Sequence, residues 1–296
     1  MGKRVFLAFF LILVMCSAVI GGVFVATSLT QEINPSFGPG GKPIVGDRPD
    51  WSGKINILVI GTDGSSKLTD TIILFQIDGK NKVIRSIPFP RDTRVPWGKG
   101  HTKINALYAS KDKEMATMKM IKSMTGLPIH YYVTIGLEGF RNFIDYLGGV
   151  EITVELAMKY KDPYQNLFID IPAGTHHMNG KMAEQYVRFR KGSAGYDGSD
   201  VQRTQRQQEF VKALIKQKLT LANITKAGDI FNEIKKYVQT NFTISEVSDL
   251  ALKVKGFDPS NFESYELSGH SQTISEISYY IFEKNKFDAD VLPNFR

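Results

Sequence analysis

The sequence predicts an α/β fold in which one mixed central sheet is flanked by helices, as an α/β/α sandwich, after one N-terminal transmembrane helix. Two observations predict the sandwich: short apolar runs typical of strands alternate with longer segments of helical periodicity, and no internal repeat interrupts them. A third observation, an uncharged apolar segment before the first strand, predicts the membrane helix. The chain after this segment is long enough for one domain with its own hydrophobic core.

The transmembrane prediction rests on residues 5–29, which carry no charge and follow Lys3 and Arg4. A helix of this length extends about 38 Å, more than the roughly 30 Å of the hydrocarbon core, so it can cross a bilayer with some tilt. Positive charge on the short side predicts that residues 1–4 are cytoplasmic and the domain extracellular, in a single-pass protein of the cell membrane. A cleaved signal peptide is the alternative, because Ala26-Thr27-Ser28 resembles a cleavage site, although the apolar run is longer than in such peptides.

Residues 30–54 are rich in proline and glycine, which predicts an extracellular linker, and residues 55–296 form the expected domain. The only cysteine, Cys16, lies in the apolar segment, so the domain can form no internal disulfide. A formal net charge of +7 outside the cytoplasm suits anionic headgroups, phosphorylated glycans or anionic wall polymers, and we expect no nucleic acid partner. The glycine fingerprint of dinucleotide sites and the Walker lysine loop are both missing from the sequence, which gives no support to nucleotide binding of those kinds.

The elements of the domain are expected in the following order. Nearly continuous apolar runs predict strands at 55–60, 71–77 and 82–87; a helix follows at 111–124, a strand at 130–135, a helix at 137–146 and a strand at 150–154. A helix near 179–186 leads into a strand at 186–190, and a long helix covers about 199–221. Thr243-Ile-Ser-Glu246 and Thr273-Ile-Ser-Glu276 have the spacing of a capping box, which predicts two more helices on either side of a strand at 263–267.

Basic residues gather in the middle of the chain. If 186–190 is a strand, its period of two puts the side chains of Arg188 and Arg190 on one face. In the helix that follows, Arg203 and Gln207 share a stripe with Arg206 beside it, and the stripe turns apolar further along. Converging guanidinium groups at a helix N-terminus suit a phosphate or pyrophosphate. The alternative is a solvated basic face without a ligand.

Two aspartates bracket the loop between the first two strands. Asp63 follows the first strand and Asp70 precedes the second, so a hairpin would bring both carboxylates to the same end of the sheet. Paired carboxylates beside a phosphate site predict a divalent cation, most plausibly Mg²⁺, which prefers hard oxygen ligands. The alternative is an ordinary Asp-Gly turn at Asp63 and a loop residue at Asp70.

An ordered set of motifs resembles the LytR-CpsA-Psr family. They are Asn56-Ile-Leu-Val-Ile-Gly-Thr-Asp63, Leu68-Thr-Asp70-Thr-Ile, Pro90-Arg91-Asp92-Thr93, Lys103-Ile-Asn-Ala-Leu-Tyr108, Tyr146-Leu-Gly-Gly-Val150, Ala173-Gly-Thr-His176, Arg188-Phe-Arg190 and Asp200 to Gln208. The resemblance implies a membrane-anchored, outward-facing phosphotransferase of bacterial envelopes. Such an enzyme moves a glycopolymer, such as teichoic acid or capsule, from a polyprenyl-pyrophosphate carrier to peptidoglycan. The sequence departs from the family pattern at Leu68 and at an apparent Phe89-Pro90 insertion.

The resemblance also implies roles for individual residues. Asp63 and Asp70 match acidic metal positions, and either carboxylate is a candidate to accept the proton of the acceptor hydroxyl. Residues with a matching role in pyrophosphate binding or charge stabilisation are Arg91, Lys103, Arg188, Arg190, Arg203, Arg206 and Gln207, of which Arg91, Arg188 and Arg190 with Asp70 are expected to act in catalysis. For Arg206, the alternative is a structural ion pair that holds its helix.

A second class of function stays open at this point. The chain could be a non-catalytic binder of polyprenyl phosphates, or a regulatory protein of the envelope. A transferase needs an acceptor hydroxyl and, in this reading, Mg²⁺, whereas a binder needs neither. No helix-turn-helix is evident in the sequence, and the expected anchor places the domain outside the cytoplasm, so gene regulation is disfavoured.

Overall fold

A six-stranded mixed sheet forms the centre of the domain. The structure is a computed structural model, and it describes residues 53–62, 68–163, 167–189, 206, 209–210, 213–214, 216–218, 231–232, 234–254, 257–258 and 261–296, with the side chains of 70, 248, 251 and 252 excepted. The strand order is β11-β6-β1-β2-β3-β12. The strands are β1 Lys54–Thr62, β2 Thr69–Asp78, β3 Val83–Pro88, β6 Tyr131–Gly136, β11 Val238–Thr240 and β12 Phe262–Ser264. β6 runs parallel to β1 and β12 parallel to β3, while the other neighbours are antiparallel, which confirms the predicted mixed sheet.

Both faces of this sheet are covered, because its strands are apolar on both sides. Along β1, Ile57 and Val59 belong to one buried cluster, and Leu58 and Ile60 to a second. Successive side chains of a strand point to opposite faces, so a continuous apolar run is what a sheet between two helical layers requires. The two clusters confirm the α/β/α sandwich.

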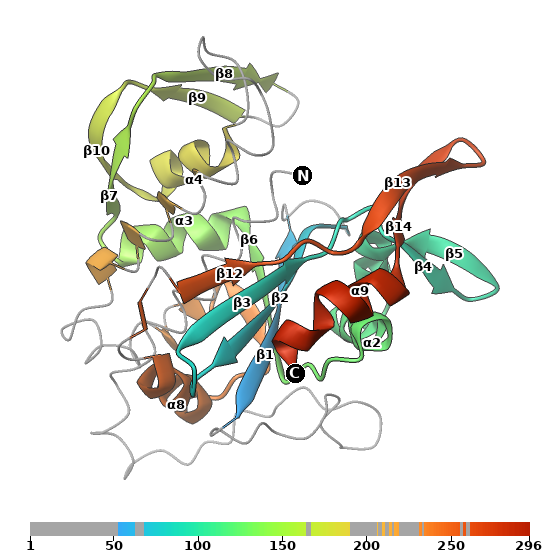
Figure 1. Ribbon diagram of the computed structural model, residues 1–296. Helices are drawn as coiled ribbons and strands as arrows, with labels where there is room; N and C mark the ends of the chain where they lie inside the picture. The colour runs from blue at the N-terminus through green and yellow to red at the C-terminus, as the bar shows by residue number, and fades with distance from the viewer. Residues whose placement is uncertain are drawn as a thin grey trace.

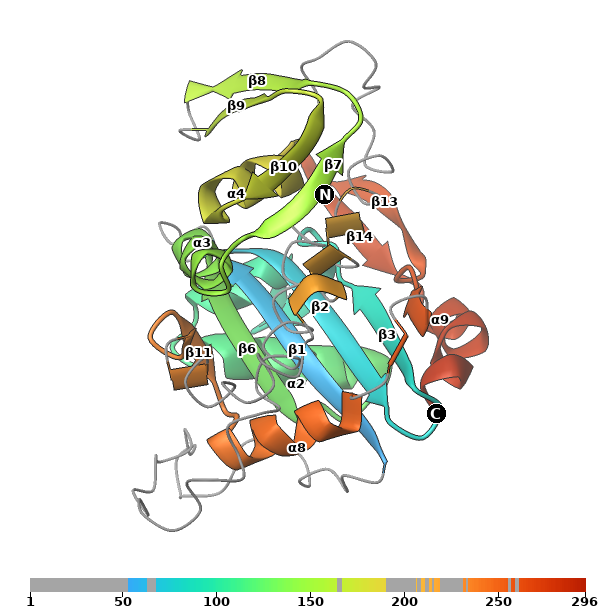
Figure 2. The ribbon, with the colours of Figure 1, turned by 90° about the vertical axis from the view of Figure 1, so that its left-hand side faces the viewer.

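The two helical layers come from different parts of the chain. The first cluster includes side chains from α3 Leu137–Tyr146, α4 Gly180–Arg188 and α8 Ile244–Val254. The second is covered by η1 Ile104–Ala109, α2 Lys113–Thr125, α9 Lys284–Asp290 and η4 Leu292–Phe295. Figure 2 shows α8 in front of the sheet and α2 behind it. The predicted helices at 111–124 and 137–146 are confirmed, the second with its predicted bounds.

Four two-stranded ribbons surround the sandwich, and only one of their strands, β7, was predicted. The ribbons pair β7 Val150–Val154 with β10 Gly174–Met178, β8 Met158–Asp162 with β9 Leu167–Ile171, β4 Arg94–Trp97 with β5 Gly100–Lys103, and β13 Gly269–Ile274 with β14 Ile277–Phe282. In Figure 1, β8 and β9 lie above α3 and α4, and β7 and β10 lie to the left of these helices, whereas β4–β5 and β13–β14 project together from the right-hand side of the molecule.

Two predicted elements are wrong. The described residues of the predicted strand 186–190, which are 186–189, do not form a strand, because α4 continues to Arg188, and Tyr186, Val187 and Phe189 are all buried. Alternation cannot bury three such side chains, but the end of a helix packed on the core can. Residues Thr273 to Glu276 do not begin a helix: Ser275 and Glu276 have φ of 47° and 65° and form the two-residue turn of the β13–β14 hairpin.

The other capping box is confirmed. The backbone N–H of Thr243 donates to Glu246 Oε2 at 2.9 Å, and the N–H of Glu246 donates to Thr243 Oγ1 at 3.3 Å. These reciprocal bonds begin α8 where the spacing predicted a helix.

The N-terminal predictions lie outside the described residues. This applies to the transmembrane segment 5–29 and to the linker 30–54 except its last two residues. Within the part of the chain that the structure describes, no helix combines the length and apolarity that a membrane span needs. Most of the predicted helix at 199–221 is also outside this part, although its described residues are helical.

Candidate functional site

One end of the central sheet collects the segments that carry the predicted site. β1 ends at Thr62, which pairs with both Gly136 at the end of β6 and Thr69 at the start of β2. β3 runs toward the same end of the sheet but stops short of it, since its last residue, Pro88, pairs with Ile73 of β2, which lies opposite Val59 of β1. We call this end of the sheet the site edge. It carries the backbone of Asp70, the start of α3 and the segment that leads from β3 to Arg91.

The structure describes only part of the predicted pair Asp63 and Asp70. The antiparallel pairing of β1 and β2 confirms the predicted hairpin, and Asp70 lies in β2 at the site edge. Asp63 and the side chain of Asp70 are outside the described residues, so the approach of their carboxylates stays a prediction. Among the described side chains, no group of three or more His, Cys, Asp or Glu could hold a metal ion.

A buried hydroxyl next to Asp70 is compatible with a polar ligand at the site edge. Thr69 is 1% exposed, and its Oγ1 has no hydrogen-bond partner among the residues that the structure describes. Buried polar atoms are normally paired, and each exception asks for an explanation. Two carboxylates and a nearby hydroxyl are all hard oxygen donors, so the residues of this loop fit Mg²⁺ in their chemistry.

Arg91 and Lys103 are brought together by Asp92. Lys103 Nζ lies 2.9 Å from Asp92 Oδ1, and Arg91 Nε lies 3.8 Å from Asp92 Oδ2. All three side chains are between 31% and 49% exposed, so this network is accessible to a ligand and adds little to stability by itself. Asp92 therefore orients the two cations that the sequence assigned to the pyrophosphate.

The backbone around this network is fixed from both sides. Thr93 is fully buried; its Oγ1 donates to Pro90 O at 2.5 Å, and its carbonyl accepts from Ile104 N–H at 2.8 Å. Phe89 of the apparent insertion is also fully buried, and its N–H extends the pairing with β2 through Ile72 O at 2.8 Å. The core thus accommodates the departure from the family pattern at Phe89, and the backbone that leads from the sheet to Arg91 is held in place.

Arg188 lies in a second cluster of charges on α4. Its Nη1 donates to Glu184 Oε1 at 2.5 Å, while Glu184 Oε2 accepts from Arg141 Nη1 at 2.7 Å. Glu184 is 6% exposed, and the Arg188 side chain is 10% exposed. Sequence reasoning missed Glu184 and Arg141, although the spacing of four residues between Glu184 and Arg188 was available as a signal.

The crossing of α3 and α4 directs Arg188 toward the site edge. Gly180, which begins α4, donates its N–H to Asp145 Oδ1 near the end of α3. One turn further along α4, Glu184 meets Arg141, one turn back along α3. The two helices are therefore antiparallel at this contact, and another turn takes Arg188 toward Leu137, where α3 begins at the site edge.

Arg206 holds the end of α4. It is 7% exposed, its Nη2 donates to Phe189 O at 2.8 Å, and its guanidinium lies 5.3 Å from the centroid of the Phe189 ring. These contacts with the Phe189 carbonyl and ring support the structural alternative, in which Arg206 holds its helix. Arg190, Arg203 and Gln207 lie outside the described residues, so their roles stay predictions.

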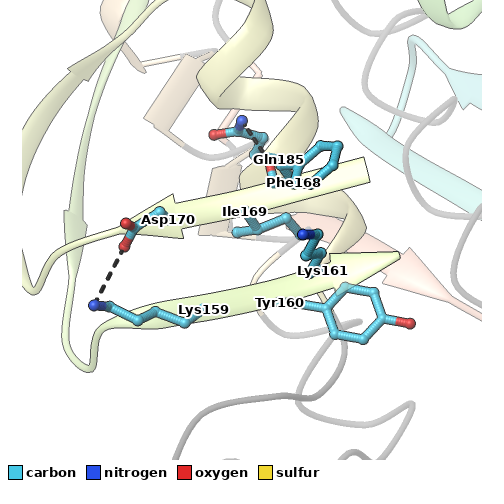
Figure 3. Close-up of a pocket in the computed structure, with 7 residues that line it drawn as sticks. All are labelled: Lys159, Tyr160, Lys161, Phe168, Ile169, Asp170 and Gln185. Atoms are coloured by element: carbon cyan, nitrogen blue, oxygen red, sulfur yellow. Dashed lines mark hydrogen bonds and ion pairs between the residues drawn. The ribbon is translucent and has the colours of Figure 1, made fainter. Parts of the chain in front are cut away.

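An open hollow of about 580 Å³ lies beside α4, on the β8–β9 hairpin (Figure 3). It is lined by Lys159, Tyr160, Lys161, Phe168, Ile169, Asp170 and Gln185. Gln185 ties the hairpin to α4, because its Nε2 donates to Phe168 O at 2.7 Å. None of these residues was predicted as part of a site.

Comparison with known proteins gives one consistent result. The model of the LytR_cpsA_psr family matches residues 27–290. TagV of Bacillus subtilis strain 168, named a polyisoprenyl-teichoic acid–peptidoglycan teichoic acid transferase, is 30% identical over 227 residues, which are 75% of this chain and 57% of that protein. The alignment thus spans little more than half of TagV. TagU of Bacillus cereus, named for the same activity, is 28% identical over 91% of this chain and 90% of its own length.

The fold agrees with this result. The crystal structure of Bacillus subtilis TagV superposes with a TM-score of 0.64 at 27% identity and covers 80% of this chain and 94% of that structure. The mixed sheet with its two helical layers is therefore the fold of these relatives.

Proposed function

The chain belongs to the LytR-CpsA-Psr family, and we propose that it is a transferase that moves a glycopolymer from a polyprenyl-pyrophosphate carrier to peptidoglycan. The names of TagU and TagV state this kind of reaction with teichoic acid as the polymer. The observation that carries the proposal is the site edge, to which separate parts of the chain bring Arg91 with Lys103 and the helix that carries Arg188.

The charges of the site fit this chemistry. A pyrophosphate diester carries two negative charges, and attack of a sugar hydroxyl on phosphorus moves further charge onto the leaving lipid phosphate. Arg188, fixed by Glu184, and the cations held by Asp92 are positioned before the substrate arrives. Such preorganised charges are worth most where charge develops during the reaction. We assign the same role to Arg190, Arg203 and Gln207.

Mg²⁺ belongs to the proposal as the cofactor. Asp63 and Asp70 would hold it, and when bound it supplies positive charge to the pyrophosphate oxygens. One of these two carboxylates also accepts the proton of the acceptor hydroxyl in this proposal, and neither is preferred over the other.

The proposed location is the cell membrane, with residues 5–29 as a single-pass anchor and the domain outside. This location gives the domain access to a lipid-linked donor and to peptidoglycan on the same side of the membrane.

The test uses the full chain in detergent or vesicles, with a synthetic polyprenyl-pyrophosphate oligosaccharide, peptidoglycan oligomers, and Mg²⁺ or a chelator. We expect release of polyprenyl phosphate, detected by mass spectrometry, that requires both the acceptor and Mg²⁺. Arg190→Ala should abolish it, whereas Lys181→Ala, at an exposed position of α4, should not. Donor binding without turnover would instead favour the non-catalytic binder.

A further inference from the structure

The hairpin β4–β5 presents an apolar tip within a positively charged segment of the chain. Trp97 at the end of β4 is 47% exposed, and the exposed Pro96 and Lys99 flank it. From residue 93 to residue 111 the chain has no aspartate or glutamate, and it carries Arg94, Lys99, Lys103 and Lys111. An exposed tryptophan with cations along the same segment is typical of protein surfaces that contact the interface of an anionic membrane. Of these cations, Lys103 is also paired with Asp92 at the base of the hairpin.

The base of this hairpin is rigid, so its tip has a defined direction. Val95 is 1% exposed and belongs to the core cluster that also contains Ile104. Tyr280 N–H donates to Asp92 O at 2.9 Å, which joins the base of the β13–β14 hairpin to the start of β4. The Tyr279 ring lies 5.8 Å from both the Arg94 guanidinium and Lys103 Nζ.

The neighbouring hairpin adds a second exposed apolar side chain, next to Glu276 of its two-residue turn. Ile277, the first residue of β14, is 47% exposed beside the two-residue turn. Figure 1 shows that β4–β5 and β13–β14 project from the same side of the molecule, away from the helices α4 and α8. Trp97 and Ile277 thus each leave nearly half of a large apolar residue exposed, on adjacent hairpins with rigid bases.

The expected anchor cannot orient the site edge without another contact. The linker enters β1 at Lys54, whereas β1 reaches the site edge only at Thr62, at its other end. A linker of 25 residues can extend about 80 Å, while β1 is about 30 Å long. The tether therefore allows almost any orientation of the domain above the bilayer. Arg91 and Lys103, in contrast, lie at the base of β4–β5.

We propose that the β4–β5 and β13–β14 hairpins dock on the surface of an anionic membrane, with Trp97 in the interface, and hold the site edge next to the lipid carrier. The purpose of this docking rests on the proposed function, but the fluorescence test of the docking does not. A sugar chain is the competing occupant of Trp97. It is disfavoured because the exposed tip from Pro96 to His101 offers no carboxylate or amide side chain to sugar hydroxyls, unlike the hollow beside α4 with its Asp170 and Gln185.

The first test uses tryptophan fluorescence, because the chain has only two tryptophans, Trp51 and Trp97. Trp51→Phe leaves Trp97 as the only reporter in the full chain, reconstituted in phosphatidylglycerol and phosphatidylethanolamine vesicles. We expect lipids brominated near the headgroup to quench its emission, and pure phosphatidylcholine or high salt to reduce the quenching. The control carries Ile244→Trp with both native tryptophans changed to Phe, because α8 lies on the opposite side of the molecule from the β4–β5 hairpin in Figure 1.

Equal emission of Trp97 with and without bromine would overturn the proposal. A shift of the emission caused by soluble peptidoglycan fragments, without quenching by lipid, would replace it with the sugar-binding alternative.

The second test separates docking from chemistry. Trp97→Ser combined with Lys99→Ser should lower transfer from a long-chain carrier embedded in vesicles by about fivefold or more, since one cation near an anionic surface already changes binding by this factor. Transfer from a short-chain, water-soluble donor should be unchanged. Ile244→Ser should affect neither donor. An equal loss with both donors would mean that the hairpin acts on the chemistry and not on docking. If no variant, including the unaltered chain, uses either donor, the proposed function fails, while the fluorescence still decides the docking.

Discussion

At the scale of single residues, the candidate site depends on side chains that touch no substrate in the proposed mechanism. Glu184 is buried and binds both Arg188 and Arg141, and Asp92 does the same for Lys103 and Arg91. A carboxylate between two cations keeps both in one place, so the arrangement of the positive charges is set by residues that carry negative charge.

Glu184→Gln tests this role. The variant keeps the shape of the side chain but removes its charge, and hydrogen bonds to charged groups contribute about 1.5–3 kcal/mol. We expect the free energy of unfolding to fall by about 2 kcal/mol and KM for the donor to rise, measured by urea unfolding and steady-state transfer. Arg141→Gln is the control: its side chain is 39% exposed, and the Glu184–Arg188 pair remains, so it should cost at most about 1 kcal/mol. Wild-type KM in Glu184→Gln would contradict the role.

His130 gives the domain a pH-dependent stability. Burial lowers the pKa of His130, and its Nδ1 accepts the N–H of Asn56 at 2.8 Å, which requires that nitrogen to be unprotonated. The unfolded chain binds a proton near the usual pKa of 6.5, so in acid the unfolded state holds more protons than the folded one. The stabilisation by unprotonated His130 is therefore complete above the unfolded-state pKa of 6.5 and is lost as the pH falls below this value toward the lowered pKa of the folded state.

We expect the free energy of unfolding, measured with urea, to decrease as the pH is lowered from about 7 to about 5. In His130→Gln, whose amide oxygen can accept a hydrogen bond without titrating, the decrease should be smaller. The exposed histidines are unchanged in this comparison, so an equal slope in both proteins would show that His130 is not responsible.

At the scale of elements, the contact between α3 and α4 decides where Arg188 is placed. A Cβ at Gly180 would lie 2.0 Å from the backbone O of Arg141 and 2.5 Å from its carbonyl carbon. Backbone atoms cannot move aside as a flexible side chain can. Only glycine at this position therefore allows the two helices to approach as closely as they do.

Gly180→Ala should push α4 away from α3 and displace Arg188. We expect a loss of about 1–3 kcal/mol in the free energy of unfolding, together with reduced transfer. Lys181→Ala, one residue further along and exposed, should change stability by less than about 0.5 kcal/mol. A Gly180→Ala protein with unaltered stability would mean that the crossing is wrong.

An element could be predicted from the sequence where the pattern of its own residues reflects its structure. Strands buried on both faces, such as 55–60, show a continuous apolar run, and α8 begins with local hydrogen bonds between Thr243 and Glu246, so both were predictable. The prediction of a strand at 186–190 failed because Val187 and Phe189, which are buried at the end of α4, alternate with arginines in the sequence as the residues of a strand do. The same capping-box spacing failed at Thr273, where the turn at Ser275 and Glu276 pairs two strands that show only weak alternation.

The site was predictable only in part, for a related reason. The motifs identified Arg91, Lys103 and Arg188 as sequence positions, and Asp92 follows Arg91 directly in one of them. The contact between Glu184 and Arg141, in contrast, depends on the packing of two helices. Periodicity within one element cannot show that Arg141 of α3 binds the same Glu184 carboxylate as Arg188 of α4.

At the scale of the whole molecule, the proposed arrangement predicts a definite topology. The chain has one cysteine, so Cys16→Ser gives a background for single-cysteine labelling. Glu155→Cys, at an exposed position of the domain, should react in intact cells with a thiol reagent that cannot cross the membrane. Lys3→Cys should react only after the cells are opened. Labelling of the second variant in intact cells, or protection of the first, would contradict the extracellular location.

The last residues of the chain pack against its first strand. Gln76 Nε2 donates to Phe295 O at 2.8 Å, Lys54 donates to the carbonyl of Arg296, and Phe287, Leu292 and Phe295 share a core cluster with Leu58 of β1. This cluster cannot close until the final residues are available. In the proposed extracellular location, this cluster would form only after the C-terminal residues have crossed the membrane, which would keep the polypeptide in a form that a narrow secretion channel accepts.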